Sequence, residues 1–216
     1  MITVIGGAKG GTGKSTVATN LAVMNARQGA DVLLVDADEQ ATATDFTLMR
    51  NQTLAQGAGY TCVSLTGRAL ATELRRLAPK YDRIVIDLGG GNQASQRGAL
   101  ALADVCLLPF GPRSFDVWTL QRAADVIDEA RALNPGLKAL AFLNRADAQG
   151  ADNESAGAII RAQPSLTFIP TPLVNRKSYP RASSVGLGVV EFTPSDAKAC
   201  AEIEALYEAV FRPPRS

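Results

Sequence analysis

A glycine-rich stretch near the amino terminus constrains the fold more than any other part of this chain. Residues 6–16 have the sequence GGAKGGTGKST and lie between an apolar segment, Ile2–Ile5, and a helical pattern that starts at Val17. This order predicts a strand, a tight turn and a helix. Glycines allow backbone N–H groups to converge on an anion, and the positive end of the following helix strengthens the attraction. The stretch therefore predicts a phosphate-binding loop.

The chemistry of such a loop assigns a role to most of its residues. The expected ligand-binding residues are Gly10, Gly11, Thr12, Gly13, Lys14, Ser15 and Thr16. Lys14 would supply a charge to the β- and γ-phosphates of a nucleotide, and the Ser15 hydroxyl would bind Mg²⁺. Ala8 departs from the usual pattern, which has glycine at that position. The alternative is a glycine-rich turn without a ligand, but a Gly-Lys-Ser sequence at the start of a helix favours phosphate binding.

Two later apolar segments, residues 31–36 and 83–87, end in the carboxylates Asp36 and Asp87. Short segments that are almost wholly apolar predict strands buried on both faces of a parallel sheet. The carboxyl ends of such strands form the ligand-binding edge, so Asp36, Asp87 and the nearby Asp38 are expected beside the phosphate-binding loop. There, carboxylates hold magnesium or orient an attacking water. The alternative is that these aspartates only cap helices or turns.

The remaining segments predict an α/β protein with a mostly parallel central sheet and helices on both faces. Further strands are expected at 60–65, 105–109, 139–143 and 166–169, and helices at about 15–27, 69–77, 94–102, 156–162 and 194–211, with another that ends near 133. Segment 45–59 is polar and is expected to be the end of a helix followed by a loop. We expect one domain, 1–216, with its last helix docked on the core and a short flexible tail.

Overall charge, cysteine spacing and apolar runs bear on nucleic-acid binding, on disulfides and metal sites, and on location. Lys and Arg number 22 against 21 Asp and Glu, so the overall charge does not indicate nucleic-acid binding, which would need a local patch. The cysteines Cys62, Cys106 and Cys200 are widely separated and fit neither a disulfide framework nor a CxxC metal site. No signal peptide and no apolar run of membrane-spanning length are visible, so a cytoplasmic location is expected.

Two motifs resemble those of one ATPase family. The segment KGGTGKS, residues 9–15, resembles the deviant Walker A motif of the ParA/MinD family, and Asp36-x-Asp38-x-Gln40 resembles its second motif. The similarity extends over nearly the whole chain and is greatest to the short, ParF-like partition ATPases of the ParA type. It implies the P-loop NTPase fold. Glu39 and Gly89 stand where members of the family commonly have proline.

The resemblance also implies roles for individual residues. Lys9, Lys14 and Asp38 would be catalytic: Lys9 would reach the nucleotide of a partner subunit, and Asp38 would orient the attacking water. Magnesium would be held by Ser15, Asp36 and Asp87, with Asp36 acting through the shell around the ion.

Two further residues would contact the adenine of ATP by the same resemblance. Asn144 ends the expected strand at 139–143, and Pro172 lies in the loop after the last expected strand. The alternative for Asn144 is a turn at the end of the strand, where asparagine is common.

The densest basic patch follows that loop. Arg176, Lys177 and Arg181 lie within six residues, and Arg212 and Arg215 lie near the carboxyl terminus. Phosphate contacts from such residues give DNA binding that is independent of sequence and sensitive to salt. An ordinary solvated surface is the alternative.

The family resemblance implies an ATPase that binds ATP and Mg²⁺, forms an ATP-dependent homodimer, binds DNA nonspecifically and associates with the nucleoid. A ParB-like or cargo adaptor protein would stimulate hydrolysis, and the cargo would be a plasmid, a chromosome region or a protein cluster. One alternative is a membrane-associated regulator like MinD, although Glu202, Glu204 and Glu208 give the last helix the wrong charge for anionic lipid. A metabolic or electron-transfer relative is a further alternative.

Overall fold

The computed structural model describes residues 1–7, 10–112, 117–149 and 151–212. Lys9, for which the family resemblance implies a catalytic role, lies outside these residues, as do Ala8, Arg113, Ser114, Asp116 and Arg215.

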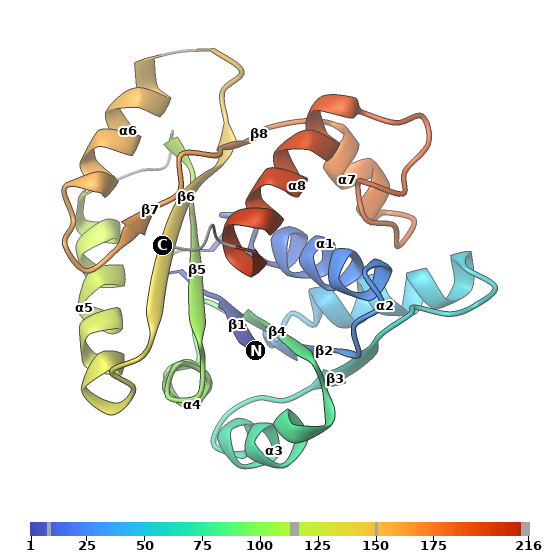
Figure 1. Ribbon diagram of the computed structural model, residues 1–216, viewed down its shortest axis with the longest axis horizontal. Helices are drawn as coiled ribbons and strands as arrows, with labels where there is room; N and C mark the ends of the chain where they lie inside the picture. Colours follow the sequence, from blue (N-terminus) through green and yellow to red (C-terminus); the bar gives the residue numbers. More distant parts are fainter. Residues whose placement is uncertain (8–9, 113–116, 150, 213–216) are drawn as a thin grey trace.

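The core of the fold is a parallel β-sheet with the strand order β3-β2-β4-β1-β5-β6-β7, and β8 pairs with β6 beyond this path (Figure 1). All pairings in the sheet are parallel. The strands are β1 (Ile2–Ile5), β2 (Val32–Ala37), β3 (Thr61–Ser64), β4 (Arg83–Leu88), β5 (Val105–Phe110), β6 (Lys138–Ala146), β7 (Thr167–Phe168) and β8 (Leu173–Val174). The expected α/β architecture is confirmed.

Helices cover both faces of this sheet (Figure 1). One apolar cluster joins the sheet to residues of α3, α4, α5 and α6, and a second joins its other face to residues of α1, α2, α7 and α8. The helices are α1 (Lys14–Arg27), α2 (Thr42–Thr53), α3 (Ala69–Leu77), α4 (Gln93–Leu100), α5 (Val117–Leu133), α6 (Ala151–Arg161), α7 (Ser178–Ser183) and α8 (Ala197–Phe211), with a short 3-10 turn at Ala78–Lys80. None of the helices in the described ranges combines the length and the apolar character needed to cross a membrane.

Helix α2 ends at Thr53 and a loop leads from it to β3, which agrees with the helix end and loop expected at 45–59. Its sequence, TATDFTLMRNQT, is rich in threonine and has little amphipathic pattern, so the local signal is weak. Contacts with distant residues hold it instead. Arg50, which is buried in α2, donates two hydrogen bonds to the carboxylate of Glu191, at 2.6 and 2.9 Å.

Four elements in the second half of the chain differ in smaller ways from the expectation. The strand β8 and the helix α7 were not expected, and both are short. Helix α6 begins at Ala151, five residues before the expected start. Helix α8 begins at Ala197 instead of 194, because the Asp196 side chain accepts a hydrogen bond from the Ala199 N–H and caps the helix there.

Candidate functional site

In the loop between β1 and α1, two of the described glycines have a backbone conformation that other residues rarely adopt. Gly11 and Gly13 have φ values of 76° and 85°, in the left-handed region that favours glycine. A Cβ atom on Gly13 would lie 2.5 Å from the Asn144 amide nitrogen, whereas one on Gly10 or Gly11 would meet no atom within 4 Å. Glycine is therefore required at 13 by close contact. Gly10 and Gly11 have no side chain, and this leaves open space beside them for a ligand.

Helix α1 begins at the end of this loop and has no side-chain cap. Gly13 occupies the capping position, and the first turn contains no acidic residue. A bound anion can therefore take the place of a capping side chain at the first N–H groups of the helix. Lys14 lies in that first turn and is buried, with 7% of its surface exposed.

Asp36 and Asp87 lie side by side on neighbouring strands. They are partners in the register of β2 and β4, and both are fully buried. Asp36 Oδ1 accepts a hydrogen bond from the Asp38 N–H at 3.2 Å, and Oδ2 accepts from the N–H and the hydroxyl of Thr44, both at 2.8 Å. Asp36 thus shapes the loop between β2 and α2, which carries Asp38.

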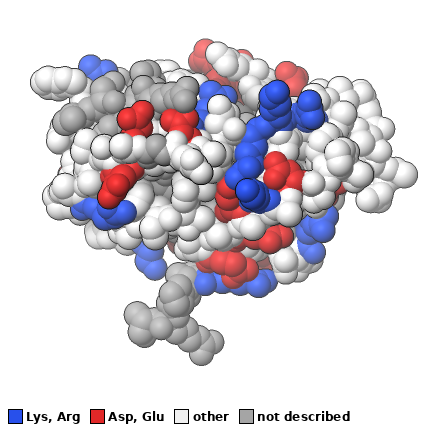
Figure 2. Space-filling view, turned by 90° about the horizontal axis from the view of Figure 1, so that it is seen from above, with Lys and Arg blue, Asp and Glu red and all other residues white. Residues whose placement is uncertain are grey.

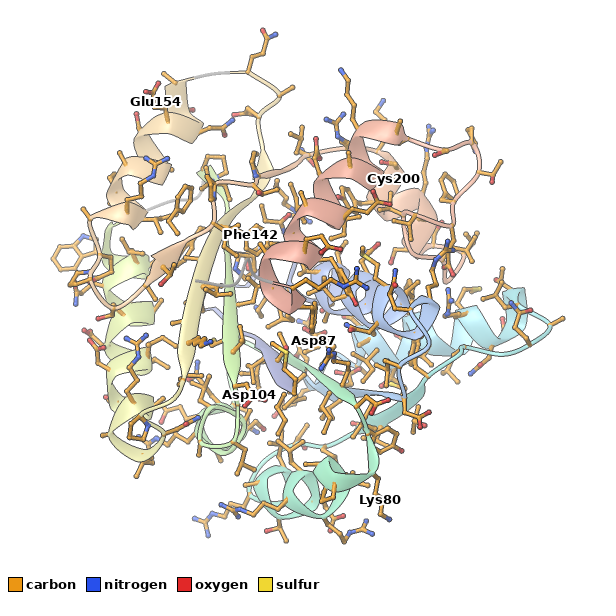
Figure 3. The ribbon with its side chains drawn as sticks, in the orientation of Figure 1. Lys80, Asp87, Asp104, Phe142, Glu154 and Cys200 are labelled. Atoms are coloured by element: carbon orange, nitrogen blue, oxygen red, sulfur yellow. The ribbon has the colours of Figure 1, made fainter. Side chains whose placement is uncertain are left out.

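Asp87 differs from Asp36 because its carboxylate oxygens accept no hydrogen bond from any described residue. Figure 3 places it in the interior of the molecule, away from Lys80 and Glu154 at the rim. Burial raises the pKa of Asp87 to about 6; the charge of Asp36 acts in the same direction, and Ser15 and Lys14 oppose it. A buried carboxylate without donors is unfavourable unless a cation approaches it.

A cavity of about 690 Å³ opens where these elements meet. It is lined by Gly10, Gly11, Gly13, Lys14, Ser15, Thr16, Ala37, Asp38, Glu39, Gln40, Thr42, Gly89, Gly90, Gly91, Asn92 and Arg145. Asp36 and Asp87 are fully buried and are not among the lining residues. One cavity at the carboxyl edge of the sheet is thus shared by the loop, the start of α1 and Asp38, although Asp38 is distant from the other two in the sequence.

The loop after β4 contacts Asp38 closely. A Cβ atom on Gly89 would lie 2.8 Å from the Asp38 carboxyl carbon and 3.0 Å from its Cα atom. Asp38 Oδ1 accepts a hydrogen bond from the Gln40 N–H at 3.1 Å. Glycine at 89 therefore allows Asp38 to occupy this position.

A second cavity of about 370 Å³ adjoins the first. Its lining residues are Gly13, Thr16, Val17, Asn144, Arg145, Leu173, Val174, Asn175, Arg176, Tyr179, Pro180, Ser183, Ser184 and Ile203. Asn144, the expected adenine contact, lines it and donates its amide N–H to the Thr12 carbonyl at 2.6 Å. Pro172 is not among the lining residues, and the neighbouring Leu173 and Val174 take that place.

The residues present fit magnesium held together with a nucleotide. The unpartnered Asp87 oxygens and the nearby Ser15 hydroxyl are oxygen donors, which Mg²⁺ prefers. Among the described residues no group of three His, Cys, Asp or Glu side chains could hold a metal ion alone. Magnesium commonly binds through one or two carboxylates plus substrate phosphates, and this donor set matches that pattern.

The three expected DNA contacts have different surroundings. The Arg176 Nε lies 3.1 Å from both carboxylate oxygens of Glu202, and Glu202 also accepts a hydrogen bond from the Val174 N–H. Lys177 and Arg181 are exposed. Figure 2 shows a group of Lys and Arg side chains to the right of the middle of this face, with Asp and Glu side chains next to it.

Comparison with known proteins assigns the chain to a family. Residues 3–189 match the CobQ/CobB/MinD/ParA nucleotide binding domain. This chain belongs to that ParA/MinD family. It is similar to the maintenance of carboxysome distribution protein A of Halothiobacillus neapolitanus, with 26% identity over 94% of this chain and 92% of the relative. The protein of the same name from Gloeobacter kilaueensis is 29% identical over 97% of this chain and 91% of the relative.

The fold of this family member matches a solved structure as well. The complex of Cyanothece McdA with ATP superposes with a TM-score of 0.75 at 21% identity, over 97% of this chain and 95% of that chain. At this level of identity the match supports the fold.

Sequence reasoning missed several residues that line the two cavities. Arg145 lines both, and Tyr179 and Ile203 line the smaller one. Arg145 directly follows Asn144 at the end of a strand, which was the available signal for it. Tyr179 and Ile203 reach the cavity only through the way α7 and α8 dock, and no local pattern marks them.

Proposed function

We propose that this chain is an ATP-hydrolysing switch that positions a cargo by binding and releasing DNA. The observation that carries the proposal is the shared cavity. Lys14, Ser15 and Asp38 line it, and all three are close enough to the buried Asp87 carboxylate to affect its pKa. Family membership and the ATP-bound McdA structure support ATP as the ligand.

The side chains divide the chemistry among them. Lys14 neutralises charge on the β- and γ-phosphates, and the N–H groups of the loop and the start of α1 hold the phosphates in place. Ser15 and Asp87 hold magnesium, which, when bound, offsets charge that develops on the phosphates. Asp38, whose main-chain position depends on Asp36, orients the attacking water. Positioning and charge stabilisation supply most of the catalysis in such sites, so slow hydrolysis without a partner is expected.

ATP turnover and ATP binding, measured separately, test this assignment. Lys14→Ala is expected to abolish nucleotide binding, whereas Asp38→Ala is expected to bind ATP normally and to lose turnover. Normal hydrolysis by Asp38→Ala would remove Asp38 from its role. Failure of the unaltered chain to bind ATP with Mg²⁺ would overturn the proposal.

ATP is expected to bring two copies together, with Lys9 completing the site of the partner. Light scattering coupled to size exclusion measures the mass with ATP, ADP and no nucleotide. A dimer with ATP alone is expected for Asp38→Ala, which traps ATP. Lys9→Ala is expected to bind nucleotide as a monomer but to dimerise or hydrolyse poorly. A mass independent of nucleotide would contradict this part of the proposal.

The dimer is expected to bind DNA without sequence preference until an adaptor on the cargo stimulates hydrolysis. The names of two relatives concern carboxysome distribution, which makes a protein assembly a candidate cargo. Retention on random-sequence DNA with ATP, and its loss as salt is raised, tests the DNA step. Dimers that ignore DNA at low salt would remove DNA from the mechanism and leave the ATPase assignment standing.

Membrane attachment through α8 is disfavoured by its surroundings. Its apolar side chains Ile203, Leu206 and Tyr207 are buried in the core, and Glu204 and Glu208 are on its exposed side. Flotation of the ATP-bound protein with anionic liposomes is expected to leave it in the unbound fraction.

A further inference from the structure

Arg145 has an unusual backbone conformation near the end of β6. Its φ is 54°, in the left-handed region that arginine rarely adopts. It lies at an irregularity in the pairing of β6 with β8, because Asn144 pairs with Leu173 and Ala146 with Val174. Such an extra residue redirects its side chain, and strained residues of this kind cluster at functional sites. The direction in which Arg145 points is therefore the feature to explain.

The side chain points to the phosphate-binding loop. Arg145 Nη1 donates a hydrogen bond to the Gly11 carbonyl at 2.8 Å, next to the bond from the Asn144 amide to the Thr12 carbonyl. Two consecutive residues of β6 thus hold two consecutive carbonyls of the loop. One bond uses only part of the guanidinium, which has five N–H donors in a planar fork.

Arg145 also marks the place where the two cavities meet. Among the residues that the structure describes, Gly13, Thr16 and Arg145 are the ones that line both the larger and the smaller cavity. A nucleotide that has its terminal phosphates in the larger cavity and its base in the smaller one must pass these three residues. The α-phosphate, which lies between the terminal phosphates and the nucleoside, would then lie beside these three residues. It is negatively charged, and Arg145 is the one charged residue of the three.

We propose that Arg145 binds the α-phosphate of the nucleotide and, through Gly11, couples that contact to the conformation of the phosphate-binding loop. This inference rests on the proposed function, because it requires ATP or ADP to span both cavities. The bulge and the left-handed conformation then serve to aim a cation at the junction between base and phosphates.

ADP binding by calorimetry, with Mg²⁺ present, tests the inference without interference from turnover. Arg145→Gly removes the guanidinium and leaves a residue that adopts the left-handed conformation without strain. We expect its ADP affinity to fall at least about ten-fold, the amount that one hydrogen bond to a charged group contributes. Arg145→Lys keeps the charge without the fork, so a smaller loss is expected. Arg122→Ala, which removes an exposed cation from α5, is the control and should bind ADP normally.

Thermal unfolding without nucleotide separates nucleotide binding from a structural role. The inference predicts a midpoint for Arg145→Gly close to that of the unaltered chain. ADP affinity within about two-fold of the unaltered chain would overturn it. An equal loss of affinity in Arg145→Lys, or a drop in the midpoint of more than about 5 °C in both variants, would overturn it too.

The same measurements tell the two proposals apart. If the unaltered chain and Arg122→Ala fail to bind ADP, the proposed function itself fails. If both bind ADP, Lys14→Ala does not, and Arg145→Gly binds normally, the proposed function stands and the role of Arg145 is rejected.

Discussion

Asp87 is fully buried, and its carboxylate oxygens have no hydrogen-bond partner among the described residues. Burial raises its pKa to about 6 from 3.8, so the ionised form destabilises the nucleotide-free fold at neutral pH. The folded chain binds this proton more tightly than the unfolded chain. The destabilisation is therefore fully present above about pH 6, shrinks as the pH falls toward 3.8, and disappears below that value.

Asp87→Asn is accordingly expected to stabilise the nucleotide-free protein at pH 7 while abolishing Mg²⁺-dependent hydrolysis. A shift of about two pKa units corresponds to about 3 kcal/mol, and burial of the unpaired amide reduces the gain to about 1–3 kcal/mol. Urea unfolding at pH 7 and at pH 4 measures the difference in free energy of unfolding between Asp87→Asn and the unaltered chain. This difference should be much smaller at pH 4. Glu204→Gln, on the exposed side of α8, is the control and should leave stability at pH 7 unchanged. Equal stability of Asp87→Asn and the unaltered chain at pH 7 would contradict the interpretation.

Gly89 matters because of its contact with Asp38. In Gly89→Ala, the added Cβ would lie 2.8 Å from the Asp38 carboxyl carbon, so Asp38 must move. The rate of ATP hydrolysis is expected to fall about ten-fold or more, because small misplacements of a group that orients a reactant are costly. The affinity for ATP should change little, since Lys14 and the loop are untouched.

A matched control lies two residues further along the same loop. A Cβ atom on Gly91 would meet no atom within 4 Å, so Gly91→Ala should hydrolyse ATP at nearly the normal rate. If both alanine variants slow hydrolysis equally, the freedom of the glycine loop matters and the contact with Asp38 does not.

At the scale of elements, α2 depends on the loop that follows α7. Arg50 donates hydrogen bonds to the carbonyls of Ala58 and Gly186 and to the carboxylate of Glu191. Gly186 has a φ of 68°, and a Cβ atom on it would lie 2.2 Å from the Arg50 backbone nitrogen. Helix α2 and this loop therefore form one unit.

Gly186→Ala is expected to destabilise the fold by about 3 kcal/mol or more, because backbone atoms cannot move aside cheaply. Gly29→Ala provides the matched comparison: its φ is 82°, but its Cβ would meet no atom within 4 Å. Its free energy of unfolding should therefore fall by only about 1 kcal/mol, because the left-handed conformation is the only cost. Urea denaturation measures both, and similar losses in the two variants would argue against the close contact of α2 with the loop.

At the scale of the whole molecule, the two exposed cations of the basic patch and the paired Arg176 should behave differently on DNA. Lys177→Ala and Arg181→Ala are each expected to lower ATP-dependent DNA retention and to reduce the slope of log affinity against log salt by about 1. Arg176→Ala should leave that slope nearly unchanged and lower stability instead, because it leaves Glu202 without its partner.

Filter retention of random-sequence DNA at several salt concentrations measures these slopes. Arg75→Ala removes an exposed cation from α3, which packs on the other face of the sheet, and should bind DNA normally. If the slope of log affinity against log salt falls equally for Arg75→Ala and Lys177→Ala, total charge governs DNA binding and this patch does not.

Much of the fold was predictable from the sequence because the signals are local. The apolar segments that form β2 and β4 and the glycine spacing before α1 depend on residues within one element. Parallel strands then place Asp36 beside Asp87 at one edge, as expected. The combination of strand, loop, helix and strand-ending carboxylate was thus determined by the sequence alone.

Contacts between distant parts of the chain decided the rest. Helix α2 has a weak local pattern and is held by Arg50 and Glu191, which are 141 residues apart. The pairing of Arg176 with Glu202 and the turn of Arg145 toward Gly11 likewise arise only when separate elements meet. Periodicity and glycine spacing report the conformation of a segment, whereas the partner of a charged side chain depends on how segments dock. For that reason the nucleotide loop could be foreseen, whereas the contact of the Arg145 side chain with Gly11 could not.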